Sequence, residues 1–119
     1  MRLAGTNNVL EEVAAKSVIW AKYKLFVEGD IGEDAIVFLQ GGGAQLTVHG
    51  NVSKNARVFV SGGGARATLR SYAGRATCIC VNGGRATIYT RYATQNIHVR
   101  GGSAEIKYLW PLSLVKRVT

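Results

Sequence analysis

The sequence predicts an all-β protein, a single-stranded β-solenoid (β-helix) of four to five coils of 18–21 residues. One observation is a recurring glycine cluster, with starts separated by 21, 21 and 18 residues: Gly41-Gly42-Gly43, Gly62-Gly63-Gly64, Gly83-Gly84 and Gly101-Gly102. Another is the pair of alternating apolar runs between successive clusters, which has the period of a half-buried strand. Each repeat is therefore expected to be strand, turn, strand and glycine corner, because glycine adopts positive φ at low cost.

The apolar positions of successive repeats form columns, as a solenoid requires, because each coil buries its apolar side only against its neighbours. The expected inward set of the first strand is Tyr23, Leu25, Val27, Ala44, Leu46, Val48, Ala65, Ala67, Leu69, Ala86, Ile88, Ala104 and Ile106. The set of the second strand is Ala35, Val37, Leu39, Ala56, Val58, Val60, Thr77, Ile79, Val81, Ile97 and Val99, with Ile31, Val52, Ala73 and Tyr92 at the turns. A β-sandwich or barrel of hairpins is the alternative, but it does not require this recurrence.

The two ends of the chain depart from the repeat, as terminal caps of a solenoid do. We expect one domain, with an N-terminal cap and first strand at 1–22, solenoid repeats at 23–108 and a C-terminal cap or tail at 109–119. Asn8 followed by Glu11 resembles a capping box, and good helix formers follow, so the sequence predicts a short N-terminal helix over the first coil. The apolar and basic tail is expected to lie over the last coil.

Composition narrows the class of protein. The 119 residues, 47% of them hydrophobic, suit one globular domain, and no apolar run approaches the roughly 18 to 20 residues of a transmembrane helix. No secretory signal is recognised before Leu10, so we expect a soluble protein that is cytoplasmic or exported without a classical signal peptide. Cys78 and Cys80 share one face of a strand, where a mutual disulfide fits poorly, and are predicted to be reduced thiols.

Charge is distributed unevenly along the chain. The net charge is +8, but residues 1–54 hold five basic and six acidic residues, whereas residues 55–119 hold ten basic residues and one acid, Glu105. The second half is therefore strongly basic. This asymmetry suggests an anionic partner for the C-terminal half or a charge-guided contact between molecules.

A repeated Gly-x-Ile/Val unit is present in Gly29-Asp30-Ile31-Gly32 and in Gly50-Asn51-Val52-Ser53. It resembles the coils of bactofilin-type polymer-forming proteins and of glycine-rich bacterial adhesin-like domains, over residues 23–108 and in pattern only. The resemblance implies a small bacterial solenoid that assembles or binds partners without catalysis. The period near 21, the triple-glycine corners and the dissimilar ends depart from it, so polymerisation is not carried over.

The outward positions of the second strand carry an unexpectedly apolar column. Alternation predicts a partner interface, for another protein or for a second copy in a homo-oligomer, made of these residues: Ile36, Phe38, Arg57, Phe59 and Cys80. The alternative is that the N-terminal helix or the C-terminal tail of the same chain covers the column.

A basic and aromatic surface is predicted on the later coils, beside a ladder of Thr47, Thr68 and Thr87 on the first strand. Its members are Arg66, Arg70, Tyr72, Arg75, Arg85, Tyr89, Arg91 and Tyr92. Such a surface suits a polyanion, namely nucleic acid, an acidic glycan or anionic lipid. The alternative is a solubilising face whose charges discourage edge pairing.

Catalytic and metal chemistry have weak support in the sequence. Cys78, Cys80 and His98 are expected on one face, which makes them a weak candidate for zinc, but the Cys-x-x-Cys spacing and a fourth ligand are missing. A convex solenoid with one acid after Asn55 offers few acid–base pairs. We therefore expect no enzyme activity and no cofactor.

Overall fold

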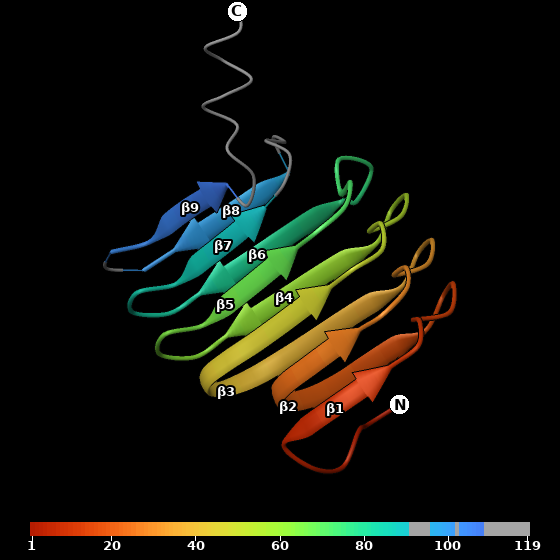
Figure 1. The fold of residues 1–119 in the computed structure, drawn as a ribbon, viewed down its shortest axis with the longest axis horizontal. Coiled ribbons are helices and arrows are strands. Elements are labelled where there is room, and N and C mark those ends of the chain that lie inside the picture. Colours follow the sequence, from red (N-terminus) through yellow and green to blue (C-terminus); the bar gives the residue numbers. More distant parts are fainter. Residues whose placement is uncertain (91–95, 102, 109–119) are drawn as a thin grey trace, which may run out of the picture.

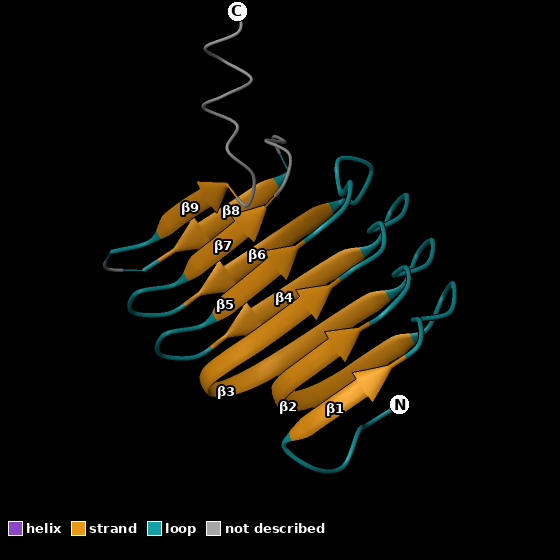
Figure 2. Cartoon of the chain, viewed as in Figure 1, coloured by secondary structure: helices purple, strands orange, loops and turns teal. Residues whose placement is uncertain are grey.

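The computed structural model describes residues 1–90, 96–101 and 103–108, and within these ranges every element is a strand and none is a helix (Figure 2). The strands are β1 (Asn7–Leu10), β2 (Val18–Val27), β3 (Ile36–Val48), β4 (Arg57–Ser61), β5 (Arg66–Leu69), β6 (Cys78–Asn82), β7 (Thr87–Thr90), β8 (Ile97–Arg100) and β9 (Glu105–Tyr108).

All strand pairs are parallel, and each strand pairs with its counterpart one coil away. The long strand β3 turns the glycine corner, so the hydrogen-bonded sheet bends into two layers (Figure 1). The first layer consists of β1, residues 24–27 and 45–48, β5, β7 and β9; the second consists of residues 18–22 and 36–40, β4, β6 and β8. The protein is therefore a β-solenoid of about five turns, and the predicted fold class is confirmed.

The core lies between the two layers in the columns that the sequence predicts. In the second layer Val37, Val58 and Ile79 are paired in register and have no exposed side-chain surface. In the first layer the corresponding column begins at Leu46 and continues one coil at a time. Bridges along Val13, Ile31 and Val52 extend the pairing to the turn side, where these residues are also buried. Small aliphatic side chains suit this narrow interior, since close packing leaves little room for larger ones.

One edge of the solenoid, the glycine edge, is a column of glycines in successive coils. Gly41, Gly62, Gly83 and Gly101 have φ values of 135°, 142°, 148° and 133°. A Cβ on Gly62 would collide with the carbonyl oxygen of Gly41, and the same contact recurs up the column. The ring of Tyr23 lies against Gly41, where a Cβ would come within 2.7 Å of it. Only glycine permits both this φ and this close approach of backbones.

At the opposite edge, the turn edge, side chains add hydrogen bonds to the backbone ones that join successive coils, such as Ile31 N–H to Asn51 O. Asp30 Oδ1 accepts a hydrogen bond from the backbone N–H of Asn51 at 2.7 Å, and Asn51 Oδ1 accepts one from Tyr72 N–H at 3.1 Å. Asp34 and Asn55, one coil apart, have left-handed φ values of 58° and 61°. Aspartate and asparagine tolerate this conformation better than most residues. The turn edge therefore repeats through amide and carboxylate groups.

The predicted N-terminal helix is wrong. Residues Asn7–Leu10 form strand β1 and pair in parallel with residues 24–27, so the first coil begins inside the expected cap. Tyr23 is also wrong as a core residue: it is 42% exposed and has a φ of 66°. It alone makes the corner between Lys22 and Lys24, where the next coil uses residues 41–44. Tyr23 alone departs from the expected alternation, since Leu25 and Val27 after it are buried as predicted.

Three later positions also differ from the predictions. Ile106, predicted as a core residue, is 45% exposed on β9, the end strand of the first layer. Thr77 is exposed and Ala76 is buried in its place. Thr87 pairs with Arg66, so Tyr89 continues the ladder after Thr47 and Thr68. The offset between coils is the same in both pairings, and Arg85 takes the corner position that Gly64 has one coil earlier. Tyr92 and the predicted C-terminal tail lie outside the described residues.

Candidate functional site

A stack of aromatic rings crosses the outer surface of the second layer. Trp20, Phe38 and Phe59, here called the aromatic column, are paired in register on successive strands. The rings of Trp20 and Phe38 have centroids 4.1 Å apart and planes 14° apart, and those of Phe38 and Phe59 are 5.2 Å and 15° apart. The guanidinium carbon of Arg2 lies 5.5 Å from the Trp20 ring centroid. The column thus spans three coils and has a cation at its N-terminal end.

The stacking geometry determines which part of each ring a partner meets. Nearly parallel rings at these separations place their faces against one another, so the outer surface presents mainly ring edges. An aromatic ring is negative on its faces and positive at its edge. The exposed surface of the column is therefore apolar with a weakly positive rim.

The second-layer face, meaning the outward residues of the second layer, contains no carboxylate among the residues that the structure describes. Its members are Val18, Trp20, Lys22, Ile36, Phe38, Gln40, Arg57, Phe59, Ser61, Cys78, Cys80, Asn82, His98 and Arg100. Lys22, Arg57 and Arg100 are exposed on it, and Arg2 joins them beside Trp20. The one ion pair within the described ranges, between Lys107 and Glu105, lies elsewhere.

The structure places the predicted interface residues together on this face. Ile36, Phe38, Phe59 and Cys80 are half-buried there, and Arg57 is exposed. Sequence reasoning missed Trp20, which is 37% exposed and extends the column by one coil. The alternation of Val18, Trp20 and Lys22 indicates an outward position for Trp20. These residues lie within the expected N-terminal cap at 1–22, so the pattern was not assigned to a coil.

No described segment covers the aromatic column. The N-terminal segment that was expected to cover the column as a helix is a strand of the first layer, so the prediction that it covers the column is wrong. The tail, the other expected cover, lies outside the described residues.

A hollow of about 260 Å³ lies at the N-terminal end of the column. Arg2, Trp20, Lys22 and Gln40 contribute side chains to it, and residues 3–5 and Ala21 complete its lining. An apolar ring, two cations and an amide thus surround one opening.

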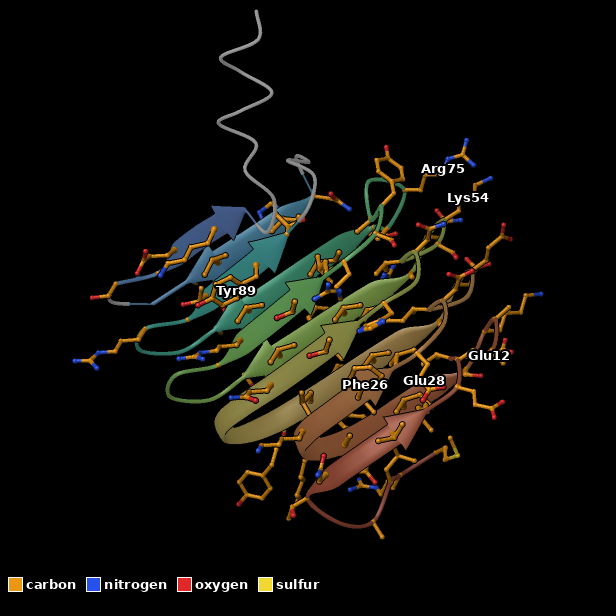
Figure 3. All side chains as sticks on the ribbon, in the orientation of Figure 1. Glu12, Phe26, Glu28, Lys54, Arg75 and Tyr89 are labelled. Carbon is orange, nitrogen blue, oxygen red and sulfur yellow. The ribbon has the colours of Figure 1, made fainter. Side chains whose placement is uncertain are left out.

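The predicted polyanion surface divides into two parts. Arg66, Arg85 and Tyr89 line a hollow of about 420 Å³ on the first layer, beside the glycine edge. Arg70, Tyr72 and Arg75 lie instead toward the turn edge, as the separation of Tyr89 and Arg75 in Figure 3 illustrates. Arg91 and Tyr92 lie outside the described residues.

The hollow on the first layer, here called the corner hollow, also contains a cation that the sequence did not single out. Lys107 lies 5.8 Å from the Tyr89 ring centroid and 3.9 Å from Glu105 Oε2. Arg85 reaches the hollow from a left-handed corner with a φ of 64°, the position that glycine occupies in earlier coils. Three cations therefore face one carboxylate in this hollow.

The thiol and imidazole groups of the second layer do not form a metal site. Cys80 and His98 are paired on neighbouring coils, as the sequence predicts, but Cys78 is aligned with Asn96. No group of three metal-ligating side chains is found in the part of the chain that the structure describes. Burial and a hydrogen bond with Cys78 raise the pKa of the Cys80 thiol, so it is protonated and poorly nucleophilic at neutral pH.

No protein-family model, curated protein or solved structure matches this chain. Within the described ranges there is also no helix of the length and apolarity needed to cross a bilayer. Fold and surface together define a parallel β-solenoid with an aromatic column on one layer and a basic hollow on the other.

Proposed function

We propose that this protein is a non-enzymatic interaction module, which holds the second-layer face rigid for contact with another protein or a second copy. The observation that carries the proposal is the aromatic column itself, a continuous apolar surface of three rings that no described segment covers. Apolar surface that is continuous across several coils is typical of a contact site, whereas single exposed apolar residues are common on any protein.

The contrast with the first layer supports this function over a purely structural one. Stacked rings do stabilise a sheet, by about 0.5–1.5 kcal/mol per pair beyond their buried area. The corresponding outward column of the first layer has aromatic rings only at Phe26 and Tyr89, and Thr47 and Thr68 separate them. The coil therefore forms without a continuous aromatic stack, so the stack on the second layer favours a role in binding.

The test is the substitution Phe59→Asp, with Thr68→Asp on the other layer of the same coil as the matched control. We expect Phe59→Asp to abolish self-association in light scattering, or recovery of a partner in pull-downs, while Thr68→Asp leaves both unchanged. Circular dichroism checks that both variants remain folded. A monomeric wild-type protein that recovers no partner, or equal behaviour of the two variants, would contradict the proposal.

A second candidate function is binding of a polyanion at the corner hollow. The observation that favours it is the gathering of Arg66, Arg85 and Lys107 around 420 Å³ of open space with Tyr89 beside them. Contacts between cations and a polyanion weaken steeply as salt rises. We expect retention on heparin at low salt that Arg66→Ser reduces and Arg75→Ser, on the turn edge, does not. Flow-through of the wild-type protein at low salt would contradict it.

A further inference from the structure

We infer that the second-layer face binds an extended acidic segment of a partner protein, whose carboxylates contact Arg2, Lys22, Arg57 and Arg100 while its apolar side chains cover the aromatic column. This inference rests on the proposed function and specifies the chemistry of the partner. It follows from three features of the face: the sign of its charges, the orientation of its rings and the hollow at its end.

The charges of the face are all of one sign. Among its described residues Arg2, Lys22 and Arg57 flank the column, Arg100 lies two coils beyond Phe59, and no carboxylate is present. The same chain carries Glu11, Glu12, Glu28, Asp30, Glu33 and Asp34 on its early coils, so carboxylates are available to the protein but absent from this face. Complementary charge favours an acidic partner and rejects a basic one.

The rings of the aromatic column also favour an acidic partner. Because the faces of Phe38 are covered by Trp20 and Phe59, a partner meets the positive ring edges. Carboxylates are attracted to such edges, and aliphatic side chains are indifferent to them. Nucleic-acid bases stack on ring faces, so this column suits them poorly.

The layout fits an extended segment that runs along the solenoid axis. Lys22, Gln40, Ser61, Asn82 and Arg100 form one outward row along the glycine edge of the face. Its two cations are four strand spacings apart, roughly 19 Å, which an extended peptide of about six residues covers. The amide and hydroxyl groups between them can hydrogen-bond to peptide groups.

The hollow beside Trp20 gives the segment an anchor. About 260 Å³ is enough to admit one side chain, and Arg2 and Lys22 flank the opening. A membrane surface would use neither the hollow nor the amide row. Phe38 and Phe59 are also half-buried rather than protruding, whereas binding to a bilayer interface depends on apolar side chains that enter it.

The experiment uses the full chain with Trp110→Phe, so that Trp20 is the only tryptophan. The probe is a peptide of about nine alternating Glu and Leu residues, titrated while Trp20 fluorescence is followed. The matched probe replaces every Glu by Gln. We expect saturable binding of the Glu peptide, at least tenfold weaker binding of the Gln peptide, and a Kd for the Glu peptide that rises with salt.

Variants then locate the site. Lys22→Ser with Arg57→Ser is expected to weaken binding of the Glu peptide at least tenfold, whereas Lys24→Ser with Arg70→Ser, on the first layer, leaves it unchanged. Equal binding of the two peptides, or no binding of the Glu peptide, would overturn the inference. Sensitivity of partner recovery to Phe59→Asp would still decide the proposed function separately.

Two competitors complete the test. Oligo-dT and vesicles containing about a third phosphatidylserine are added to the peptide complex. No displacement of the peptide supports the inference. Displacement that Phe59→Asp prevents would overturn it in favour of nucleic acid or an anionic membrane, whichever competitor succeeds.

Discussion

The glycine edge and the turn edge both reverse the chain once per coil and share backbone hydrogen bonds between coils, but they differ in the part that side chains play. At the glycine edge the backbones of Gly41, Gly62, Gly83 and Gly101 approach so closely that no side chain fits. At the turn edge, side-chain oxygens of Asp30 and Asn51 add hydrogen bonds to the backbone ones that join one coil to the next. The difference teaches that side-chain acceptors reinforce the turn edge, whereas the glycine edge depends on close backbone contact alone.

The largest effect is expected from Gly62→Ala. Its Cβ would meet the carbonyl oxygen of Gly41 at a φ of 142°, so the two backbones must separate. We expect a loss of about 2–4 kcal/mol in the free energy of unfolding, measured by urea denaturation. The control is Gly63→Ala, next in the chain, where a Cβ meets nothing within 4 Å. Equal losses for the two variants would remove the distinction between packed and open glycines.

A smaller loss is expected at the turn edge from Asn51→Ala. The variant leaves Tyr72 N–H without the side-chain acceptor 3.1 Å away and costs about 1 kcal/mol, because a typical net hydrogen bond is worth about 0.5–1.5 kcal/mol. Asn51→Asp keeps the Oδ1 acceptor and is expected to unfold at a urea concentration close to that of the wild type. If both variants unfold like the wild type, side chains do not secure this edge.

At the glycine edge, replacement of Arg85 is expected to raise stability and to weaken polyanion binding. Arg85 has a left-handed φ of 64°, so Arg85→Gly relieves backbone strain and is expected to raise the free energy of unfolding by about 0.5–1 kcal/mol. The same change removes a cation from the corner hollow and should lower the salt concentration of elution from heparin. Loss of stability in the variant would show that Arg85 contributes contacts that outweigh the strain.

The smallest effect concerns Cys80, which lies between the two edges. Its raised pKa means that the folded state keeps the thiol proton to higher pH than the unfolded state. Stability is therefore unaffected at neutral pH and falls as the pH rises through the ordinary thiol range near 9.0. Because Cys80 is partly exposed, solvent screening keeps this fall small. We expect the free energy of unfolding, measured by urea denaturation, to fall less between pH 7 and pH 9.5 in Cys80→Ser than in the wild type.

The contrast between the edges also explains how much of the fold the sequence predicts. A glycine column leaves a visible cluster in every repeat, and alternation then places Val37, Val58 and Ile79 in one buried column. The turn edge has a shorter marker, the Gly-x-Ile/Val unit of two repeats, and the first coil has none. Asn7–Leu10 has the local pattern of a helix start, but pairing with residues 24–27 overrides that preference.

The candidate site was predicted in part for the same reason. Phe38 and Phe59 lie in coils of regular length, so their shared outward column was recognised. Trp20 precedes a corner made by Tyr23 alone, and the change in length concealed its alignment with Phe38. The grouping of Lys107 with Arg66 and Arg85 depends on three-dimensional proximity across coils, because Lys107 is paired with Tyr89 and with neither arginine.

Leu39, Val60 and Val81 are evenly spaced in the sequence and are paired on successive coils, so one coil in this region is a repeat unit of constant length. Residues 41–61 begin at one packed glycine and end before the next, so a tandem duplicate would join itself through the same backbone contacts. Each added copy would lengthen the solenoid by one strand spacing, about 4.8 Å, and add one more phenylalanine to the stack. Whole-repeat duplication would therefore lengthen the aromatic column without any change in the packing of the interior.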